Sequence, residues 1–230
     1  MTEAVIVVRN LAAHYGAREV FHDVTFTVRG GQALGVLGPS GAGKTTLLRM
    51  LVGLIRPSAG DIRLDGRQPR DALARVPVGY FAGEATLPGS VRASHLRALR
   101  GGDEIAADRR RLRTLSRGTR QLLGLRTALG RQHLRLLVLD EPWEGLDPDA
   151  ARWLSTMVET KRDWGAAVVL SSHRLHDLAG VCDSYLFLVG GRATLLQAHD
   201  ISSVGPVTAA ALTDVFDRLR GGEARFRAVS

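Results

Sequence analysis

Short apolar runs separated by glycine, proline and charged residues fill the first third of the chain. Runs of this kind, bounded by turn signals, are typical of strands. The strands expected here are Ala4–Val8, Val24–Val28, Ala33–Leu37 and Asp61–Leu64. Between the last two of them, leucines recur at helical spacing and predict a helix over Thr45–Leu54.

The middle of the chain is different, because helical spacing replaces the short apolar runs. Three helices are expected there, at Ser90–Leu99, Ile105–Leu112 and about Thr119 to Leu129.

The last third returns to strands that alternate with helices. Leu134–Leu139 and Ala166–Leu170 are dominated by apolar residues, as expected of strands buried on both faces. The other elements expected there are a helix at Asp149–Trp164, a hairpin of Leu186–Val189 and Ala193–Leu196, and a terminal helix at about Ala209–Leu219. This alternation predicts an α/β fold with a mainly parallel sheet.

Composition narrows the class of protein. The chain has 230 residues, 45% hydrophobic and 23% charged, which is typical of a folded globular protein and not of a disordered one. No apolar run approaches the ~18 residues that a membrane-spanning helix needs. The N-terminus lacks the layout of a secretory signal. Cys182 is the only cysteine, which excludes an internal disulfide and fits a reducing cytosol.

The positive charge is concentrated in one segment. Between Arg92 and Arg135 the chain has 12 Arg, no Lys and 3 acidic residues, a net charge of +9, whereas the whole chain carries +8. Such a patch suits nucleic acid, an anionic membrane face or an acidic partner surface. A coding bias would explain the preference for Arg over Lys, but it does not explain the clustering.

The strongest chemical motif is Gly38-Pro-Ser-Gly-Ala-Gly-Lys44-Thr45, which fits G-x-x-x-x-G-K-[ST]. A phosphate needs several backbone N–H groups aimed at one point, and glycines let the chain wrap it without side chains in the way. Lys44 can reach the β- and γ-phosphates, and the Thr45 hydroxyl can hold Mg²⁺. The motif predicts a nucleotide-phosphate site.

Polar residues also end two of the predicted buried strands. Asp140 and Glu141 follow one of them, and His173 follows the other. Ligands of open α/β sheets bind at the carboxyl ends of the strands, so these side chains are expected near the phosphate loop. There Asp140 would hold Mg²⁺, Glu141 would act as general base on a water, and His173 would contact the γ-phosphate or position the water. From its spacing alone, His173 could equally be structural.

Three further segments follow one family's order. Tyr15 precedes the phosphate loop, LSRGTRQ at Leu115–Gln121 precedes Asp140, and EGLDP at Glu144–Pro148 follows it. With these segments the chain resembles, over nearly its whole length, the nucleotide-binding subunit of ATP-binding cassette (ABC) transporters. The three segments are similar to that family's adenine-stacking aromatic, its LSGGQ signature and its D-loop, and His173 is similar to its switch histidine.

The resemblance implies a set of functional residues. Those that would contact nucleotide are Tyr15, Gly38, Ser40, Gly41, Ala42, Gly43, Lys44, Thr45, Thr46, Ser116, Gly118 and Asp147. Those implied for metal are Thr45 and Asp140, and those implied for catalysis are Lys44, Glu141 and His173. Two residues have simpler alternatives: Tyr15 as an edge-strand aromatic and Ser116 as a helix cap.

The resemblance also implies the fold. It is an α/β fold, a RecA-like P-loop NTPase core with an N-terminal antiparallel β subdomain and a shortened α-helical insert. Residues 1–230 would form one ABC ATPase domain, with the core in 1–83 and 131–230 and the reduced helical subdomain in 84–130. The segment 211–222 resembles the tail helix of the drug- and polymer-export branch, which favours an exporter.

The chain departs from the family's pattern in three places. Gly83 stands where the family has a glutamine that contacts Mg²⁺, so we expect either that Glu84 partly substitutes or that coupling runs without this contact. Arg117 replaces a signature glycine, and we expect its long side chain to point into solvent rather than toward a partner's phosphate. The helical lobe is also short, and it carries a cluster that we expect to face anionic lipid headgroups or an acidic loop, namely Arg109, Arg110, Arg111 and Arg113.

The resemblance thus implies an ATPase subunit that uses ATP and Mg²⁺ and closes against a second cassette, identical or different. Separate multi-span membrane subunits would convert that closure into transport, with the chain in the cytoplasm on the inner face of the cell membrane. Two alternatives remain: a soluble ABC ATPase acting on nucleic acid or ribosomes, which a single cassette disfavours, and a degenerate cassette that binds ATP as a regulatory switch.

Overall fold

The computed structural model describes residues 3–83 and 114–222. The strands in these ranges are β1 (Ala4–Tyr15), β2 (Arg18–Arg29), β3 (Ala33–Leu37), β4 (Ala59–Leu64), β5 (Val78–Phe81), β6 (Leu136–Asp140), β7 (Ala167–Ser172), β8 (Ser184–Val189) and β9 (Arg192–Gln197). The helices are α1 (Lys44–Leu51), α2 (Pro69–Ala72), α4 (Arg117–Leu129), α5 (Pro148–Asp163), α6 (Leu175–Leu178), α7 (Ala198–Ile201) and α8 (Ala209–Arg220). The helices expected at Ser90–Leu99 and Ile105–Leu112, with the arginine cluster, lie outside the described residues.

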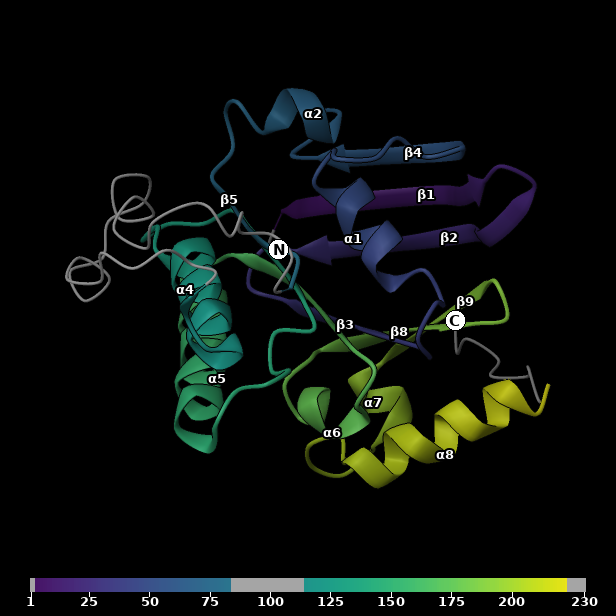
Figure 1. Cartoon of the computed structure of the whole chain (residues 1–230). Helices are drawn as coiled ribbons and strands as arrows, with labels where there is room; N and C mark the ends of the chain where they lie inside the picture. Colours follow the sequence, from purple (N-terminus) through teal and green to yellow (C-terminus); the bar gives the residue numbers. More distant parts are fainter. Residues whose placement is uncertain (1–2, 84–113, 223–230) are drawn as a thin grey trace.

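The strands form two sheets (Figure 1). A three-stranded antiparallel sheet has the order β2-β1-β4, and a six-stranded sheet has the order β5-β6-β7-β3-β8-β9. Neighbours from β5 to β8 are parallel, and β9 pairs with β8 as an antiparallel hairpin. The expected α/β class, with a mainly parallel sheet and an N-terminal antiparallel sheet, is confirmed.

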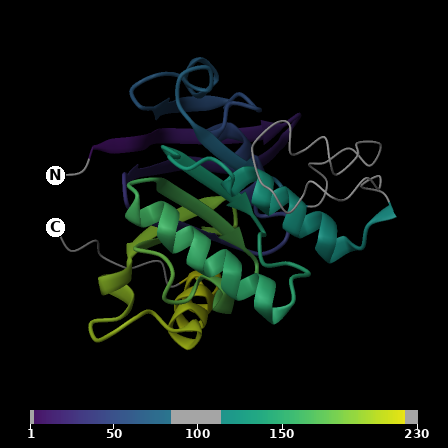
Figure 2. The same ribbon diagram turned by 90° about the vertical axis from the view of Figure 1, so that its left-hand side faces the viewer.

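The six-stranded sheet separates two apolar cores, which explains why its central strands are apolar up to their carboxyl ends. Side chains alternate between the two faces of a strand. Leu136 and Val138 face the core that contains α1 and the three-stranded sheet. Leu137 and Leu139 face the core that contains α4, α5 and α8, on the opposite side of the sheet (Figures 1 and 2). Each face is therefore covered, and the sheet has no solvated side that would require polar positions.

Helix α1 is shorter than the expected Thr45–Leu54. It ends at Leu51, because Gly53 takes the left-handed conformation with φ 68° and turns the chain away. Leu54 is 62% exposed and so does not belong to the buried face, although its spacing suggested it. Strand β5 and the four-residue helices α2, α6 and α7 were not expected from the sequence, because such short elements have no resolvable periodicity.

The single cysteine, Cys182, is 6% exposed and packs in the core that contains α4 and α5. Burial raises the pKa of its thiol well above the usual range. Within residues 3–83 and 114–222, none of the helices combines the length and the hydropathy that crossing a bilayer would require.

Candidate active site

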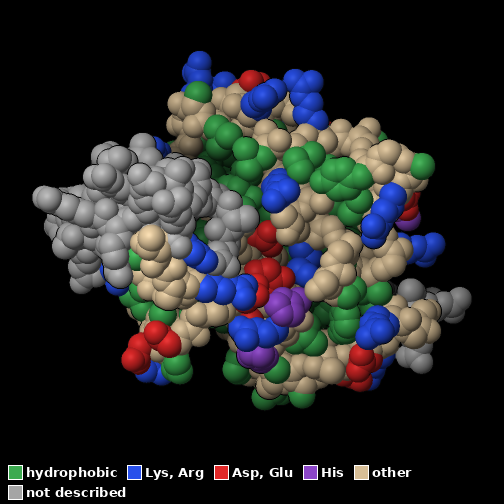
Figure 3. Space-filling view, in the orientation of Figure 1, with side chains coloured by type: hydrophobic (Ala, Val, Ile, Leu, Met, Phe, Trp, Pro, Cys, Tyr) green, Lys and Arg blue, Asp and Glu red, His purple; other side chains and the backbone are tan. Residues whose placement is uncertain are grey.

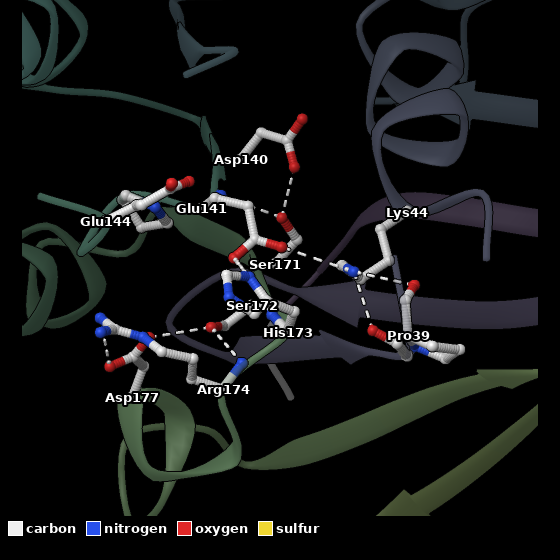
Figure 4. Close-up of polar contacts among 12 residues, drawn as sticks. Pro39, Lys44, Asp140, Glu141, Glu144, Ser171, Ser172, His173, Arg174 and Asp177 are labelled. Atoms are coloured by element: carbon white, nitrogen blue, oxygen red, sulfur yellow. Dashed lines mark hydrogen bonds and ion pairs between the residues drawn. The ribbon is translucent and has the colours of Figure 1, made fainter. Parts of the chain in front are cut away.

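The loop that joins β3 to α1 curls around the side chain of Lys44. The ammonium Nζ donates to the carbonyl oxygens of Gly38 at 2.8 Å and Pro39 at 3.3 Å (Figure 4). Lys44 is the first residue of α1 and is only 7% exposed. The positive end of α1 and the lysine therefore lie together at the carboxyl end of β3, as an anion site requires.

Two glycines of this loop are left-handed, with φ 81° at Gly41 and φ 98° at Gly43. A Cβ at Gly41 would have no heavy atom within 4 Å, whereas a Cβ at Gly43 would lie 2.5 Å from Val20 Cγ1 and 2.9 Å from Phe21 Cδ1. Gly43 is therefore required by both backbone conformation and space.

These two glycines form a matched pair for a stability measurement. Gly43→Ala is expected to lower the free energy of unfolding by about 2–4 kcal/mol, because backbone strain and overlap add. Gly41→Ala carries only the backbone strain, about 1 kcal/mol. Urea unfolding of both variants checks this, and equal losses would contradict the packing described at Gly43.

A pocket of about 420 Å³ opens in front of the loop. Its lining residues are Tyr15, Arg18, Val20, Ser40, Gly41, Gly43, Lys44, Thr45, Thr46 and Glu141. Tyr15 is 53% exposed, and its hydroxyl lies 3.3 Å from Thr46 Oγ1, which ties the end of β1 to α1. The side chain of Tyr15 thus lies at the rim of the pocket. Figure 3 shows acidic, basic and histidine side chains gathered near the centre of this side of the molecule.

Asp140 and Thr45 are in direct contact. Thr45 Oγ1 donates to Asp140 Oδ2 at 2.6 Å, and Ser171 Oγ donates to the other carboxylate oxygen. Asp140 ends β6, Ser171 lies opposite it on β7, and the carboxylate is held in place at 4% exposure. Hydroxyl and carboxylate oxygens side by side next to a phosphate loop are the donors that Mg²⁺ prefers, so these two residues fit that ion.

Glu141 lies between Lys44 and His173 (Figure 4). Its Oε1 is 3.4 Å from Lys44 Nζ, and its Oε2 accepts from the backbone N–H of His173 at 3.1 Å and lies 2.9 Å from His173 Nδ1. Glu141 takes the left-handed conformation with φ 48°, and its own N–H donates to Ser171 O and Oγ. The start of α1 and the ends of β6 and β7 thus bring together three side chains that are far apart in the sequence.

The remaining residues implied by the resemblance do not line this pocket. Ser116 is the N-cap of α4 and accepts from Thr119 N at 3.2 Å, and Asp147 is the N-cap of α5 and accepts from Ala150 N at 2.8 Å. The capping alternative for Ser116 is therefore observed, and it leaves the hydroxyl exposed at the helix end. Gly118 follows in the first turn of α4.

Arg117 is exposed, as expected, but it is not surrounded by solvent alone. Its guanidinium pairs with Glu144 at 2.7 Å, with the two side chains 59% and 45% exposed. Gly83 has φ 71°, and a Cβ there would lie 3.9 Å from the carbonyl oxygen of Asp140. The Gly83 position is therefore beside the acidic strand end, whereas Glu84 lies outside the described residues.

Sequence reasoning missed three residues near the site. Arg18 lines the pocket beside Tyr15, Ser171 holds Asp140 and Glu141, and Gln121 donates to the backbone that follows β6. Ser171 had a visible signal, because it is polar at the end of an apolar run. Gln121 had a weaker one, as a polar residue within the buried face of α4.

Comparison with known proteins identifies the family. Residues 21–144 match the family model described as ABC transporter. The chain is 32% identical to the lipopolysaccharide export system ATP-binding protein LptB of Escherichia coli K12, over 87% of this chain and 96% of that protein. It is 30% identical to the SkfA peptide export ATP-binding protein SkfE of Bacillus subtilis, over 80% of this chain and 85% of that protein.

Solved structures agree in fold. An ATP-binding subunit of an ABC transporter superposes with a TM-score of 0.74 at 24% identity, covering 92% of this chain and 99% of that chain. A dimeric bacterial ABC transporter cassette superposes with a TM-score of 0.73 at 19% identity, covering 84% and 98%. Since the family model matches more than half of the chain and relatives match most of their own length, the chain belongs to the ABC transporter family, as an ATP-binding subunit.

Proposed function

We propose that the chain hydrolyses ATP in the pocket beside residues 38–45 and thereby powers export through separate membrane subunits. The observation that carries this proposal is that Lys44 and Thr45, at the start of α1, contact Glu141 and Asp140 at the carboxyl end of β6. A buried ammonium at a helix N-terminus binds polyphosphate, and a carboxylate 3.4 Å from that ammonium is placed to act on a water at the terminal phosphate.

The residues divide by the part of the nucleotide that they contact. The Tyr15 ring stacks on the base. Lys44 and its loop hold the phosphates, through Gly38, Ser40, Gly41, Ala42, Gly43 and Thr46. Thr45 and Asp140 hold Mg²⁺, which when bound neutralises charge on the phosphate oxygens.

Glu141 is the general base and accepts a proton from the attacking water. His173 orients it, because Nδ1 and the backbone N–H both contact the same carboxylate oxygen and leave Oε1 directed at Lys44. This arrangement is intact, which argues against a degenerate cassette that only binds ATP.

A second cassette completes the site. Ser116, Gly118 and Asp147 lie outside the pocket of their own chain, so they act on the nucleotide held by another copy, identical or different. The dimeric state of a structurally similar cassette supports this assembly.

The names of the relatives support the proposed membrane subunits and the proposed direction of transport. LptB and SkfE are both named as ATP-binding proteins of export systems, which supports an exporter and a place in the cytoplasm on the inner face of the cell membrane. The relatives also favour transport over the nucleic-acid alternative. The proposal that the arginine cluster at 109–113 meets lipid headgroups concerns residues outside the described ranges.

The decisive test is phosphate release from ATP by the purified chain, alone and together with membrane protein that copurifies from its own cells. We expect magnesium-dependent, saturable turnover that rises when the membrane subunit is present. ATP-driven dimerisation without turnover would instead favour the regulatory alternative, and nucleic-acid binding with a steep salt dependence would favour the other one.

A further inference from the structure

Gln121 is a buried polar side chain that the mechanism above does not use. It is 3% exposed, within the face of α4 that otherwise buries Leu123, Leu125 and Leu129. Its amide Nε2 donates to the carbonyl oxygens of Glu141 at 3.3 Å and Pro142 at 3.2 Å. Burial of an amide costs free energy unless it is hydrogen-bonded, and these two carbonyl oxygens supply the partners of Nε2.

One hydrogen bond of Gln121 is made to the carbonyl oxygen of Glu141, whose backbone is strained. Glu141 is a residue with a side chain at φ 48°, in the left-handed region that such residues rarely adopt. Its N–H is held by Ser171 and its C=O by Gln121, so side chains from β7 and α4 hold the two ends of this residue. If either of these hydrogen bonds were lost, the Cα–Cβ bond of Glu141 would turn and its carboxylate would move away from Lys44.

The first turns of α4 lie alongside residues 141–145, the segment that follows β6. Arg117, one turn before Gln121, pairs with Glu144. A Cβ at Gly118 would lie 3.2 Å from the carbonyl oxygen of Gly145, so the backbone of α4 closely approaches the backbone of residues 141–145 at this point. The side chain of Gln121 is itself buried, and it is the one of these three helix residues that bonds to Glu141.

We propose that Gln121 is a positioning residue for ATP hydrolysis: it transmits the position of α4 to the carboxylate of Glu141 through the backbone carbonyls of Glu141 and Pro142. The inference rests on the proposed role of Glu141 as base. Because Ser116 caps the same helix, whatever engages the exposed end of α4 also acts, through Gln121, on the orientation of the base in the same chain.

Gln121→Met tests the inference, because methionine has similar length but donates no hydrogen bond. We expect the turnover number to fall about ten- to a hundredfold, since displacement of a catalytic group by about 1 Å has effects of that size. The dissociation constant of magnesium ATP should stay within about twofold, because Gln121 does not line the pocket. Leu125→Met, on the buried face of the same helix, is the matched control and should leave both quantities unchanged.

A double-mutant cycle separates positioning from a general loss of stability. The Glu141→Gln variant has no general base left for Gln121 to position. In this background Gln121→Met should therefore not lower the residual turnover further. If the two losses multiply, or if Gln121→Met alone keeps wild-type turnover, the inference is wrong while the proposed function stands. If Glu141→Gln itself keeps wild-type turnover, the proposed role of Glu141 fails, and this inference fails with it.

Gln121→Asn covers the case in which the methionine variant does not fold. It keeps the amide but is shorter by one methylene, so it should retain the fold and lose part of the turnover. Wild-type turnover in a folded Gln121→Asn variant whose ATP affinity is also unchanged would count against the proposed geometry.

Discussion

Replacement of Glu141 by glutamine is expected to lower the ATP turnover number by about a hundred- to a thousandfold, the usual contribution of a general base. Glutamine has the shape of glutamate and can keep a contact with His173, but its amide cannot accept the proton of the attacking water. The affinity for magnesium ATP should not fall, because the substitution removes a negative charge 3.4 Å from Lys44 and beside the phosphate pocket. Steady-state phosphate release and equilibrium nucleotide binding measure the two quantities separately.

The matched control is Glu144→Gln, an acid-to-amide exchange three residues later. Glu144 is 45% exposed, pairs with Arg117 and does not line the pocket. Loss of such an exposed pair is worth at most about 1 kcal/mol of stability and should leave turnover within about twofold. Equal loss of turnover in both variants would contradict the assignment of Glu141 as the base.

Lys44→Ala is expected to weaken binding of magnesium ATP by about thirty- to a thousandfold, which corresponds to about 2–4 kcal/mol for a buried, hydrogen-bonded charge. Lys44 is 7% exposed, and removal of its ammonium leaves the phosphates facing a loop whose two freed carbonyl oxygens repel them. Isothermal titration calorimetry gives the dissociation constant directly.

Arg49→Ala is the control for this effect. Arg49 lies on the same helix, is exposed and does not line the pocket, so it tests the loss of one positive charge without the loss of the contact. Unchanged affinity in Lys44→Ala, with the fold verified by circular dichroism, would refute the placement of the phosphates in this loop.

The parts of the site that sequence could predict are those encoded by neighbouring residues. The phosphate loop is local, because its glycines and lysine must lie within a few residues of one another to enclose one group. Asp140 and Glu141 were also accessible, because they follow an apolar run and the carboxyl edge of a parallel sheet is where ligands bind. The apolar strands were recognisable because both of their faces are covered.

What sequence could not predict depends on contacts between distant elements. The pairing of Gln121 with the residues after β6 spans 20 positions and exists only once α4 has packed on the sheet. The left-handed backbone of Glu141 has no sequence signal, since that conformation is more often taken by glycine or asparagine. The end of α1 was misplaced because the spacing of Leu54 continues the helical pattern past Gly53.

The burial of Cys182 has a practical consequence for labelling experiments. A thiol whose ionisation is suppressed by burial reacts slowly with maleimides and methanethiosulfonates. Since no other cysteine is present, reporter groups can be attached at newly introduced surface cysteines without first deleting the native one. Fluorescent or spin-labelled pairs across two copies would then test the proposed closure of two cassettes in the otherwise natural chain.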